Sequence, residues 1–173
     1  CLLIFSYYNA IHVVTKEYAL HTEKDLQSNQ LTIAVITDLH MDTTMNIKQL
    51  EEYCTQINEK NPDIILLLGD IFDESTSKES MELACEAFST LSSTFGTYYV
   101  FGNHDVNIRR PLASFSKEDI ISNLTKNNVT VLDDESVLIN HSFYLIGRSD
   151  VSFFQNSNRK TIAQLLEPLD TNK

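Results

Sequence analysis

Three short apolar runs, each followed at once by a polar cluster, constrain the fold of this chain more than any other feature. They occupy residues 31–37, 64–68 and 97–101, and their unbroken apolar, β-rich composition is typical of strands that are buried on both faces. Residues 46–60 and 77–93, which separate the runs, carry apolar side chains at intervals of three and four, as one-sided helices do. Strand–helix–strand order favours right-handed crossovers and parallel pairing. The sequence therefore predicts an α/β domain built on a parallel sheet.

The rest of the chain predicts a β-rich continuation of the same domain. β-branched residues between Ala10 and Leu20 predict a strand, and Ser116 is expected to cap a helix. Three short strands and a last helix are predicted after it, at residues 129–132, 136–139, 143–147 and 159–166. A length of 173 residues suits one domain.

Each buried run is followed by side chains that can bind a metal ion. Asp38 and His40 follow the first run, Asp70 follows the second and Asn103 follows the third. Ligands gather outside the carboxyl ends of parallel strands, so these groups are expected to converge. On an extended segment, Asp38 and His40 would point to the same side because they are two residues apart. Mixed nitrogen and oxygen donors suit manganese, iron or zinc better than calcium.

The three clusters also resemble, in the same order, the motifs of a known family. They read Asp38-Leu39-His40, Gly69-Asp70-Ile71-Phe72-Asp73 and Gly102-Asn103-His104-Asp105. The calcineurin-like metallophosphoesterases carry Asp-x-His, Gly-Asp-x-x-Asp and Gly-Asn-His followed by Asp or Glu. The resemblance extends from about Ala10 to Asp150 and is similar in character to the bacterial membrane-associated subgroup. It implies a four-layer αββα sandwich with mixed sheets.

The resemblance implies two divalent metal ions, of manganese, iron or zinc. Asp38 and His40 would bind the first ion, Asp70 would bridge the two ions, and Asn103 would bind the second. The catalytic residues implied are His104, which would lie near the scissile phosphate, and Asp105. Asp105 is expected to orient His104 by accepting a hydrogen bond from it, as carboxylates beside metal sites commonly do.

Several other polar residues are predicted to have structural or solvated roles. Asp73 is expected to support its own loop. Arg109–Arg110 is interpreted as a solvated loop pair, and Arg159–Lys160 as the start of an exposed helix face. The remaining histidines lack a motif and are expected to be structural or solvated; they are His12, His21 and His141.

The implied activity is metal-dependent hydrolysis of a phosphoester, either a small molecule or a lipid head group. Two ions about 3.5 to 4 Å apart would lower the pKa of a shared water, and the hydroxide would attack phosphorus. Family members with a complete site carry further histidines beyond the region present here. We therefore expect a C-terminally truncated domain with an incomplete second sheet, whose activity belongs to the full-length protein. The alternative is a non-catalytic module that keeps the fold and binds a partner through its strand-end loops.

Charge and the N-terminal segment bear on partners and location. A net charge of −11, from 13 basic and 24 acidic residues, disfavours nucleic acid as a substrate. Residues 1–9 are expected to be the remnant of an apolar anchor or leader, or else a buried strand, and residues 10–173 the phosphoesterase domain. A bacterial, membrane-associated protein is therefore expected, with a cytoplasmic location as the alternative. Cys54 and Cys85 lie on apolar helix faces and are predicted to be buried.

Overall fold

The structure is a computed structural model that describes residues 2–24, 26, 30–105, 114–151 and 159–170. Five helices and six strands are seen in these residues. They are, in chain order, α1 (Leu2–Ile11), β1 (Ile33–Ile36), α2 (Ile47–Glu59), β2 (Ile64–Leu68), α3 (Lys78–Phe88), β3 (Thr97–Val100), α4 (Lys117–Lys126), β4 (Val129–Val131), β5 (Glu135–Ile139), β6 (Phe143–Gly147) and α5 (Ile162–Leu166).

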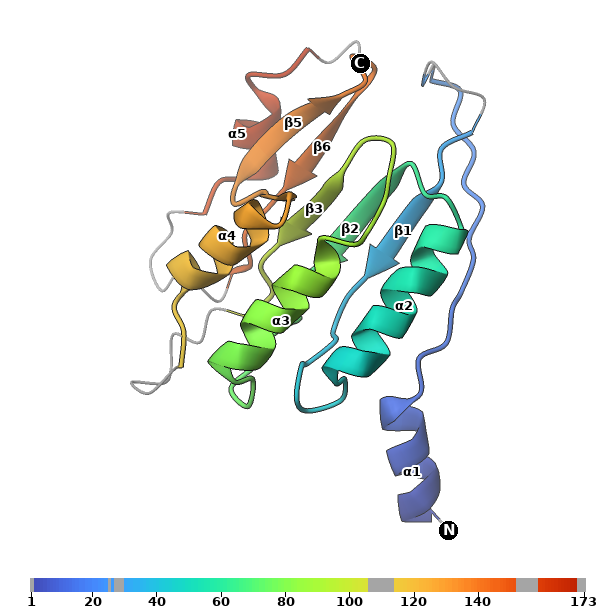
Figure 1. Ribbon diagram of the computed structural model, residues 1–173. Coiled ribbons are helices and arrows are strands. Elements are labelled where there is room, and N and C mark those ends of the chain that lie inside the picture. Colours follow the sequence, from blue (N-terminus) through green and yellow to red (C-terminus); the bar gives the residue numbers. More distant parts are fainter. Residues whose placement is uncertain (1, 25, 27–29, 106–113, 152–158, 171–173) are drawn as a thin grey trace.

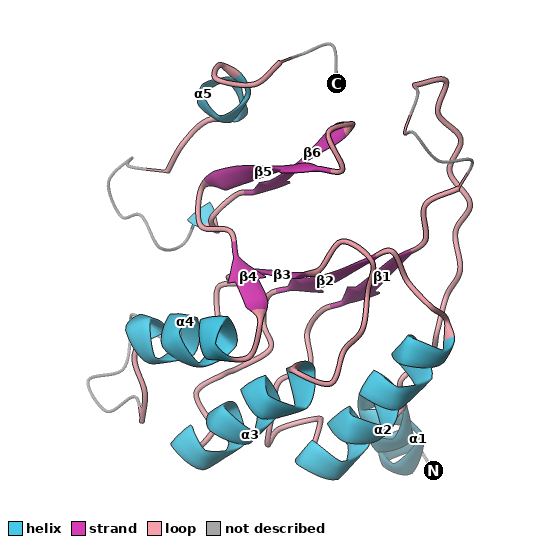
Figure 2. Cartoon of the chain, turned by 45° about the horizontal axis from the view of Figure 1, so that its top comes forward, coloured by secondary structure: helices cyan, strands magenta, loops and turns pink. Residues whose placement is uncertain are grey.

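The elements form four layers. Four parallel strands make the first sheet in the order β1-β2-β3-β4, and the antiparallel pair β5-β6 makes the second. Helices α2, α3 and α4 cover one face of the first sheet, the second sheet lies over the other, and α5 lies outside the second sheet (Figures 1 and 2). This arrangement confirms the predicted αββα sandwich with a parallel sheet.

Polar caps fix where the helices begin. Asn46 caps α2 and Ser116 caps α4, each in a reciprocal capping box, and Ser77 caps α3. Thr161 caps α5 in the same way, so this helix begins at Ile162 rather than at Arg159. These local signals explain why α2, α3 and α4 begin close to where the sequence pattern predicted, although α3 ends at Phe88 and not at residue 93.

Arg159 and Lys160 were expected to start an exposed helix face, and this prediction is wrong. The two residues precede α5 and are bound by the segments that flank the second sheet. The Lys160 backbone N–H donates to the Asp134 carboxylate at 3.0 Å, and its ammonium donates to the Asp134 carbonyl at 2.9 Å. Arg159 donates from Nε to the Ser149 carbonyl. Because Asp134 is buried in the turn between β4 and β5, these bonds tie that turn to the chain leading into α5.

Two hydrophobic clusters pack against the first sheet, one on each face. Alternate residues of β2 separate them, with Ile65 and Leu67 on the helix side and Ile64 and Leu66 on the side of the second sheet. β2 and β3 contribute to both clusters, which confirms that these runs are buried on both faces. The prediction is wrong for β1. Its residues Ile33 and Val35 are 46% and 55% exposed, because the second cluster is built on β2 and β3.

The predicted strand between Ala10 and Leu20 is also wrong. α1 ends at Ile11, and residues 12–20 are exposed without regular structure. β-branched residues favour a strand only where a neighbouring strand can pair with it, and the first sheet instead begins with β1. Among the described residues, no helix combines the length and apolar character that a membrane crossing requires.

The two helical cysteines are part of the core, as predicted. Cys54 on α2 and Cys85 on α3 are fully buried and unpaired. Burial raises the pKa of Cys54 to about 11 and that of Cys85 to about 12. Both thiols therefore stay protonated near neutral pH and serve as small apolar side chains.

Candidate metal centre

β1, β2 and β3 end at the same edge of the first sheet (Figure 1), and the polar clusters that follow them come together there. Backbone hydrogen bonds continue the pairing of β1 and β2 beyond the strands themselves. Asp38 N–H donates to the Gly69 carbonyl at 3.1 Å, and His40 N–H donates to the Asp70 carbonyl at 3.1 Å. The loops that follow these two strands consequently run side by side, which brings the first two motifs together.

The candidate ligands in these loops have left-handed backbone. The φ angles are +56° at Asp38, +43° at His40 and +49° at Asp70. This conformation costs about 1 to 2 kcal/mol for a residue with a side chain, although Asp and His tolerate it better than most. The extended geometry from which Asp38 and His40 were expected to share one side is therefore wrong, yet their side chains still converge. Local backbone strain of this kind is typical of functional sites.

Asp38, His40 and Asp70 form a group that fits a divalent cation. Each offers one ligand atom, and these atoms all lie within 4.8 Å of one another. Ligand atoms about 2.1 Å from a common ion lie up to about 4.2 Å apart, so the group is close to the spacing that one ion requires. Two carboxylates and an imidazole also match the donor chemistry of manganese, iron and zinc.

A buried carboxylate supports His40. Nδ1 of His40 lies 3.2 Å from Oδ2 of Asp73, which leaves Nε2 as the nitrogen available for a metal ion. Burial would raise the pKa of Asp73, but hydrogen bonds from Thr43, the Ser75 backbone and His40 outweigh it and lower this pKa. Asp73 also supports its own loop, as expected, by accepting the Ser75 N–H at 2.7 Å.

The third motif lies against Asp70. His104 N–H donates to Oδ1 of Asp70 at 2.8 Å, and Gly102 packs so closely that its Cα faces the Asp70 backbone and carboxylate. Asn103 lies between Gly102 and His104 in the sequence, and its side chain is exposed. Its role as the ligand of a second ion remains a prediction.

The His104 ring lies next to that of His40, with centroids 5.1 Å apart in an edge-to-face arrangement. Nδ1 of His104 is 3.1 Å from Oε2 of Glu74, a residue that the sequence had not singled out. The hydrogen bond to Glu74 is the main cause that raises the pKa of His104. The pKa of Glu74 is lowered, first by its own backbone N–H and then by His104. The only sequence signal for Glu74 was its position directly after the second motif.

The expectation that Asp105 orients His104 is wrong, because the Asp105 carboxylate is fully used elsewhere. It is 3% exposed and accepts four backbone N–H groups at 2.7 to 2.9 Å. The donors are the N–H groups of Asp70, Ile71, Phe72 and Gly102. Burial raises the pKa of Asp105 to about 6, although these N–H groups act in the opposite direction. Asp105 therefore holds the loops after β2 and β3 together.

A buried tyrosine lies beneath this carboxylate. Tyr99 is fully buried, and its hydroxyl is near enough to influence the pKa of Asp105. The hydroxyl nevertheless makes no hydrogen bond within normal limits to any residue that the structure describes. Burial raises the pKa of Tyr99 well above its usual value, so its phenol stays neutral.

The other basic and imidazole groups considered earlier do not join this group. His12, His21 and His141 are exposed, as expected of solvated residues, and the His12 ring stacks on Tyr8 with centroids 4.8 Å apart. Arg109 and Arg110 lie outside the described residues.

Comparison of the sequence with known proteins identifies a family and several relatives. The family model described as Calcineurin-like phosphoesterase matches residues 31–167. An uncharacterized metallophosphoesterase of Helicobacter pylori is 31% identical over 122 residues, which are 70% of this chain and 30% of that protein. The phosphodiesterase YaeI of Escherichia coli is 29% identical over 124 residues, 69% of this chain and 43% of its own length. A protein of Danio rerio named transmembrane protein with metallophosphoesterase domain is 30% identical over 77 residues, 44% of this chain and 17% of its own. The matched segments thus cover less than half of each of these relatives.

Proposed function

Because the chain belongs to the calcineurin-like phosphoesterase family, we propose that it carries the metal-binding part of an enzyme that hydrolyses a phosphoester by attack of water on phosphorus. The observation that supports this most strongly is the meeting of Asp38, His40 and Asp70 at the ends of two parallel strands. Exposed clusters of acidic residues are common, but in this group every member also has left-handed backbone and a buried carboxylate contacts the imidazole, two features that are typical of functional and metal sites.

The proposed site holds two divalent ions, of manganese, iron or zinc. Asp38 and His40 would bind one ion, Asn103 the other, and Asp70 both. Such ions, when bound, lower the pKa of a water molecule and neutralise charge on the phosphoryl oxygens. The chain itself supplies the arrangement of donors, which the paired loops after β1 and β2 hold in place.

His104 is proposed as the general acid. Its ring lies beside the ring of His40, and its backbone N–H donates to Asp70. His104 therefore contacts two of the proposed metal ligands. During hydrolysis a new bond forms between phosphorus and the water oxygen, and the bond to the leaving oxygen breaks. Nε2 of His104 would donate its proton to that leaving oxygen, which departs as an alcohol.

Metal-dependent hydrolysis by the full-length protein tests the proposal. After removal of metal with a chelator, we expect manganese, iron(II) or zinc to restore cleavage of p-nitrophenyl phosphate or bis-p-nitrophenyl phosphate by at least about 100-fold, since metal ions supply several kcal/mol of transition-state stabilisation. The variant His141→Asn, which changes an exposed histidine outside the site, should behave like the wild type. Metal binding without cleavage of any phosphoester would instead favour a non-catalytic binding module. A protein that binds none of the three metals would contradict the proposed hydrolase.

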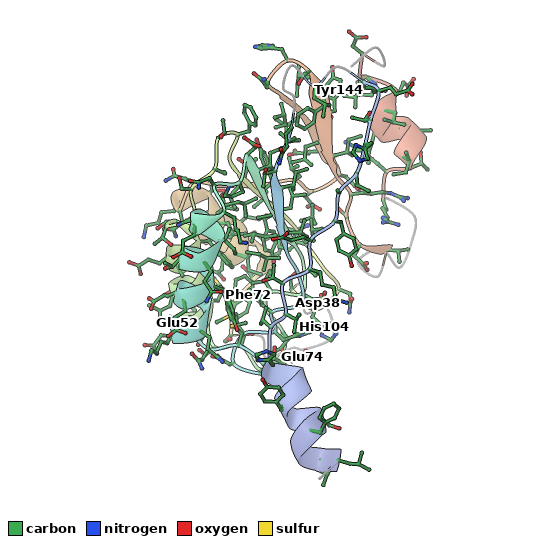
Figure 3. All side chains as sticks on the ribbon, turned by 90° about the vertical axis from the view of Figure 1, so that its right-hand side faces the viewer. Asp38, Glu52, Phe72, Glu74, His104 and Tyr144 are labelled. Atoms are coloured by element: carbon green, nitrogen blue, oxygen red, sulfur yellow. The ribbon has the colours of Figure 1, made fainter. Side chains whose placement is uncertain are left out.

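We further propose that α1 associates with a membrane surface and that the substrate includes a lipid head group. Leu2, Leu3, Phe5 and Tyr8 are all exposed, and residues 1–15 contain no charged side chain. These apolar positions spread around the helix, which suits lipid better than the single stripe that packs into a protein groove. α1 projects from the end of the molecule at which the strands of the first sheet end, so it would bring the metal group near the head groups (Figures 1 and 3).

Vesicle binding measures this association. The triple variant Leu2→Ser, Leu3→Ser, Phe5→Ser of the full-length protein should bind phospholipid vesicles at least about 100-fold more weakly than the wild type, because each buried side chain contributes about 1.5 to 3 kcal/mol. The control variant Tyr18→Ser, Leu20→Ser removes exposed apolar side chains outside the helix and should bind normally. Equal binding by all three proteins would rule out α1 as the membrane contact.

A further inference from the structure

Two consecutive carboxylates each hold a different histidine at the metal centre. Oδ2 of Asp73 contacts Nδ1 of His40 at 3.2 Å, and Oε2 of Glu74 contacts Nδ1 of His104 at 3.1 Å. The two rings stand edge to face, 5.1 Å apart. Figure 3 shows Glu74 and His104 close to Asp38 at the same end of the molecule. The two histidines are therefore held in the same way, each through its Nδ1.

We propose that Glu74 is the positioning residue for His104, a role that rests on the proposed hydrolytic function. An Nδ1–H that donates to the Glu74 carboxylate leaves Nε2 as the nitrogen that gives up a proton during the reaction. The proton passes from Nε2 to the leaving oxygen, which takes the electron pair of the broken P–O bond. Glu74 keeps its own charge throughout and stabilises the imidazolium before the transfer.

The neighbouring carboxylates are committed to other partners. Asp105, the residue next to His104, is bound by four backbone N–H groups. Asp73 contacts His40 and the Ser75 N–H. Asp70 binds the backbone N–H of His104 through Oδ1, which fixes the position of the residue but leaves its ring to be oriented by another group. Glu74 is the carboxylate seen at Nδ1 of that ring among the residues the structure describes.

Glu74 can be removed without disturbing the core, because its side chain is 37% exposed. In the full-length protein we expect Glu74→Ala to lower kcat by about 10- to 100-fold for a phosphoester with an alkyl or phenyl leaving group. The loss should be only a few-fold for a p-nitrophenyl ester, whose leaving oxygen needs little protonation. Glu74→Gln keeps a hydrogen-bond acceptor at Nδ1 and should recover most of the lost rate. Glu82→Ala, which removes an exposed carboxylate from α3, is the matched control and should leave both rates unchanged.

A readout that needs no activity is the protonation of the His104 ring in metal-free protein. With ¹⁵N-labelled histidine, nuclear magnetic resonance should show neutral His104 with its proton on Nδ1 in the wild type and in Glu74→Gln. In Glu74→Ala the proton should shift largely to Nε2, while the signals of His40 and of the exposed His141 stay unchanged.

The two readouts separate this inference from the proposed function. A wild-type His104 with its proton on Nε2, or a Glu74→Ala variant with unchanged ring signals, would overturn the positioning role whether or not the protein hydrolyses anything. Equal losses of kcat for good and poor leaving groups would also overturn it. If the wild type cleaves no phosphoester while the ring signals respond to Glu74→Ala as expected, the contact stands and the proposed function fails.

Discussion

Replacing Asp70 with asparagine should lower phosphoester hydrolysis by the full-length protein by about 10³-fold or more. Asp70 belongs to the group of converging donors and is the residue proposed to contact both ions. Asparagine keeps the shape of the side chain and can still accept the His104 N–H through its amide oxygen, so the change removes mainly the negative charge. Because metal ions contribute several kcal/mol to this chemistry, weaker metal binding translates into a rate loss of this size.

Elemental analysis after gel filtration, together with kcat, checks this prediction. The variant should retain at least one metal ion fewer per chain than the wild type while unfolding at a similar temperature. Glu52→Gln offers a control, since Glu52 lies on the outer surface of α2, far from the labelled site residues in Figure 3, and is 60% exposed. An Asp70→Asn protein with full metal content and normal kcat would exclude Asp70 from the centre.

Replacing Gly69 with alanine should destabilise the protein by about 3 kcal/mol or more, the largest stability effect that we expect from a single methyl group. Gly69 has φ of +77°, which costs a residue with a side chain about 1 to 2 kcal/mol. Its new Cβ would also lie less than 3.0 Å from the backbone of Gly102, where no side-chain rotation can relieve the overlap. Overpacking of this kind adds about 1 to 3 kcal/mol.

Gly96→Ala is a matched control for the backbone contribution. Gly96 also has a positive φ, of +102°, but a Cβ there would meet only the Tyr98 ring and hydroxyl at ordinary contact distances of 3.5 Å and more. Urea unfolding should therefore show a loss of about 1 to 2 kcal/mol for Gly96→Ala and roughly twice that or more for Gly69→Ala. Equal losses for the two variants would show that the approach of Gly69 to Gly102 has no energetic importance.

Local patterns in the sequence were sufficient for most of the architecture. Unbroken apolar runs predicted β2 and β3, three- and four-residue spacing predicted α2 and α3, and Ser116 marked the start of α4. These signals act over a few residues, so the structure that they predict does not depend on contacts with distant parts of the chain. The strand expected at residues 10–20 failed because a strand also needs a partner, which no local pattern supplies.

The candidate site was predictable in its donors but not in its supporting contacts. The order of the motifs and the rule for parallel strands were enough to bring Asp38, His40 and Asp70 together. Which carboxylate would serve which histidine depended on the path of the loops in three dimensions. Asp105 follows His104 directly, yet it turns into the interior, while Glu74 reaches His104 across 30 positions of sequence. Left-handed backbone at three donors could not be read from residue types that also occur in ordinary turns.

The position of Asp105 has a consequence for how a cation would enter. The Asp105 carboxylate accepts hydrogen bonds from backbone N–H groups of both loops, and so joins the loops after β2 and β3 into one rigid unit. The donors are Asp70, Ile71, Phe72 and Gly102. The conformational freedom that an arriving ion would otherwise have to remove has already been lost when the polypeptide folds. Binding of the ion should then be fast and should change the backbone of these loops very little, because the site is preorganised.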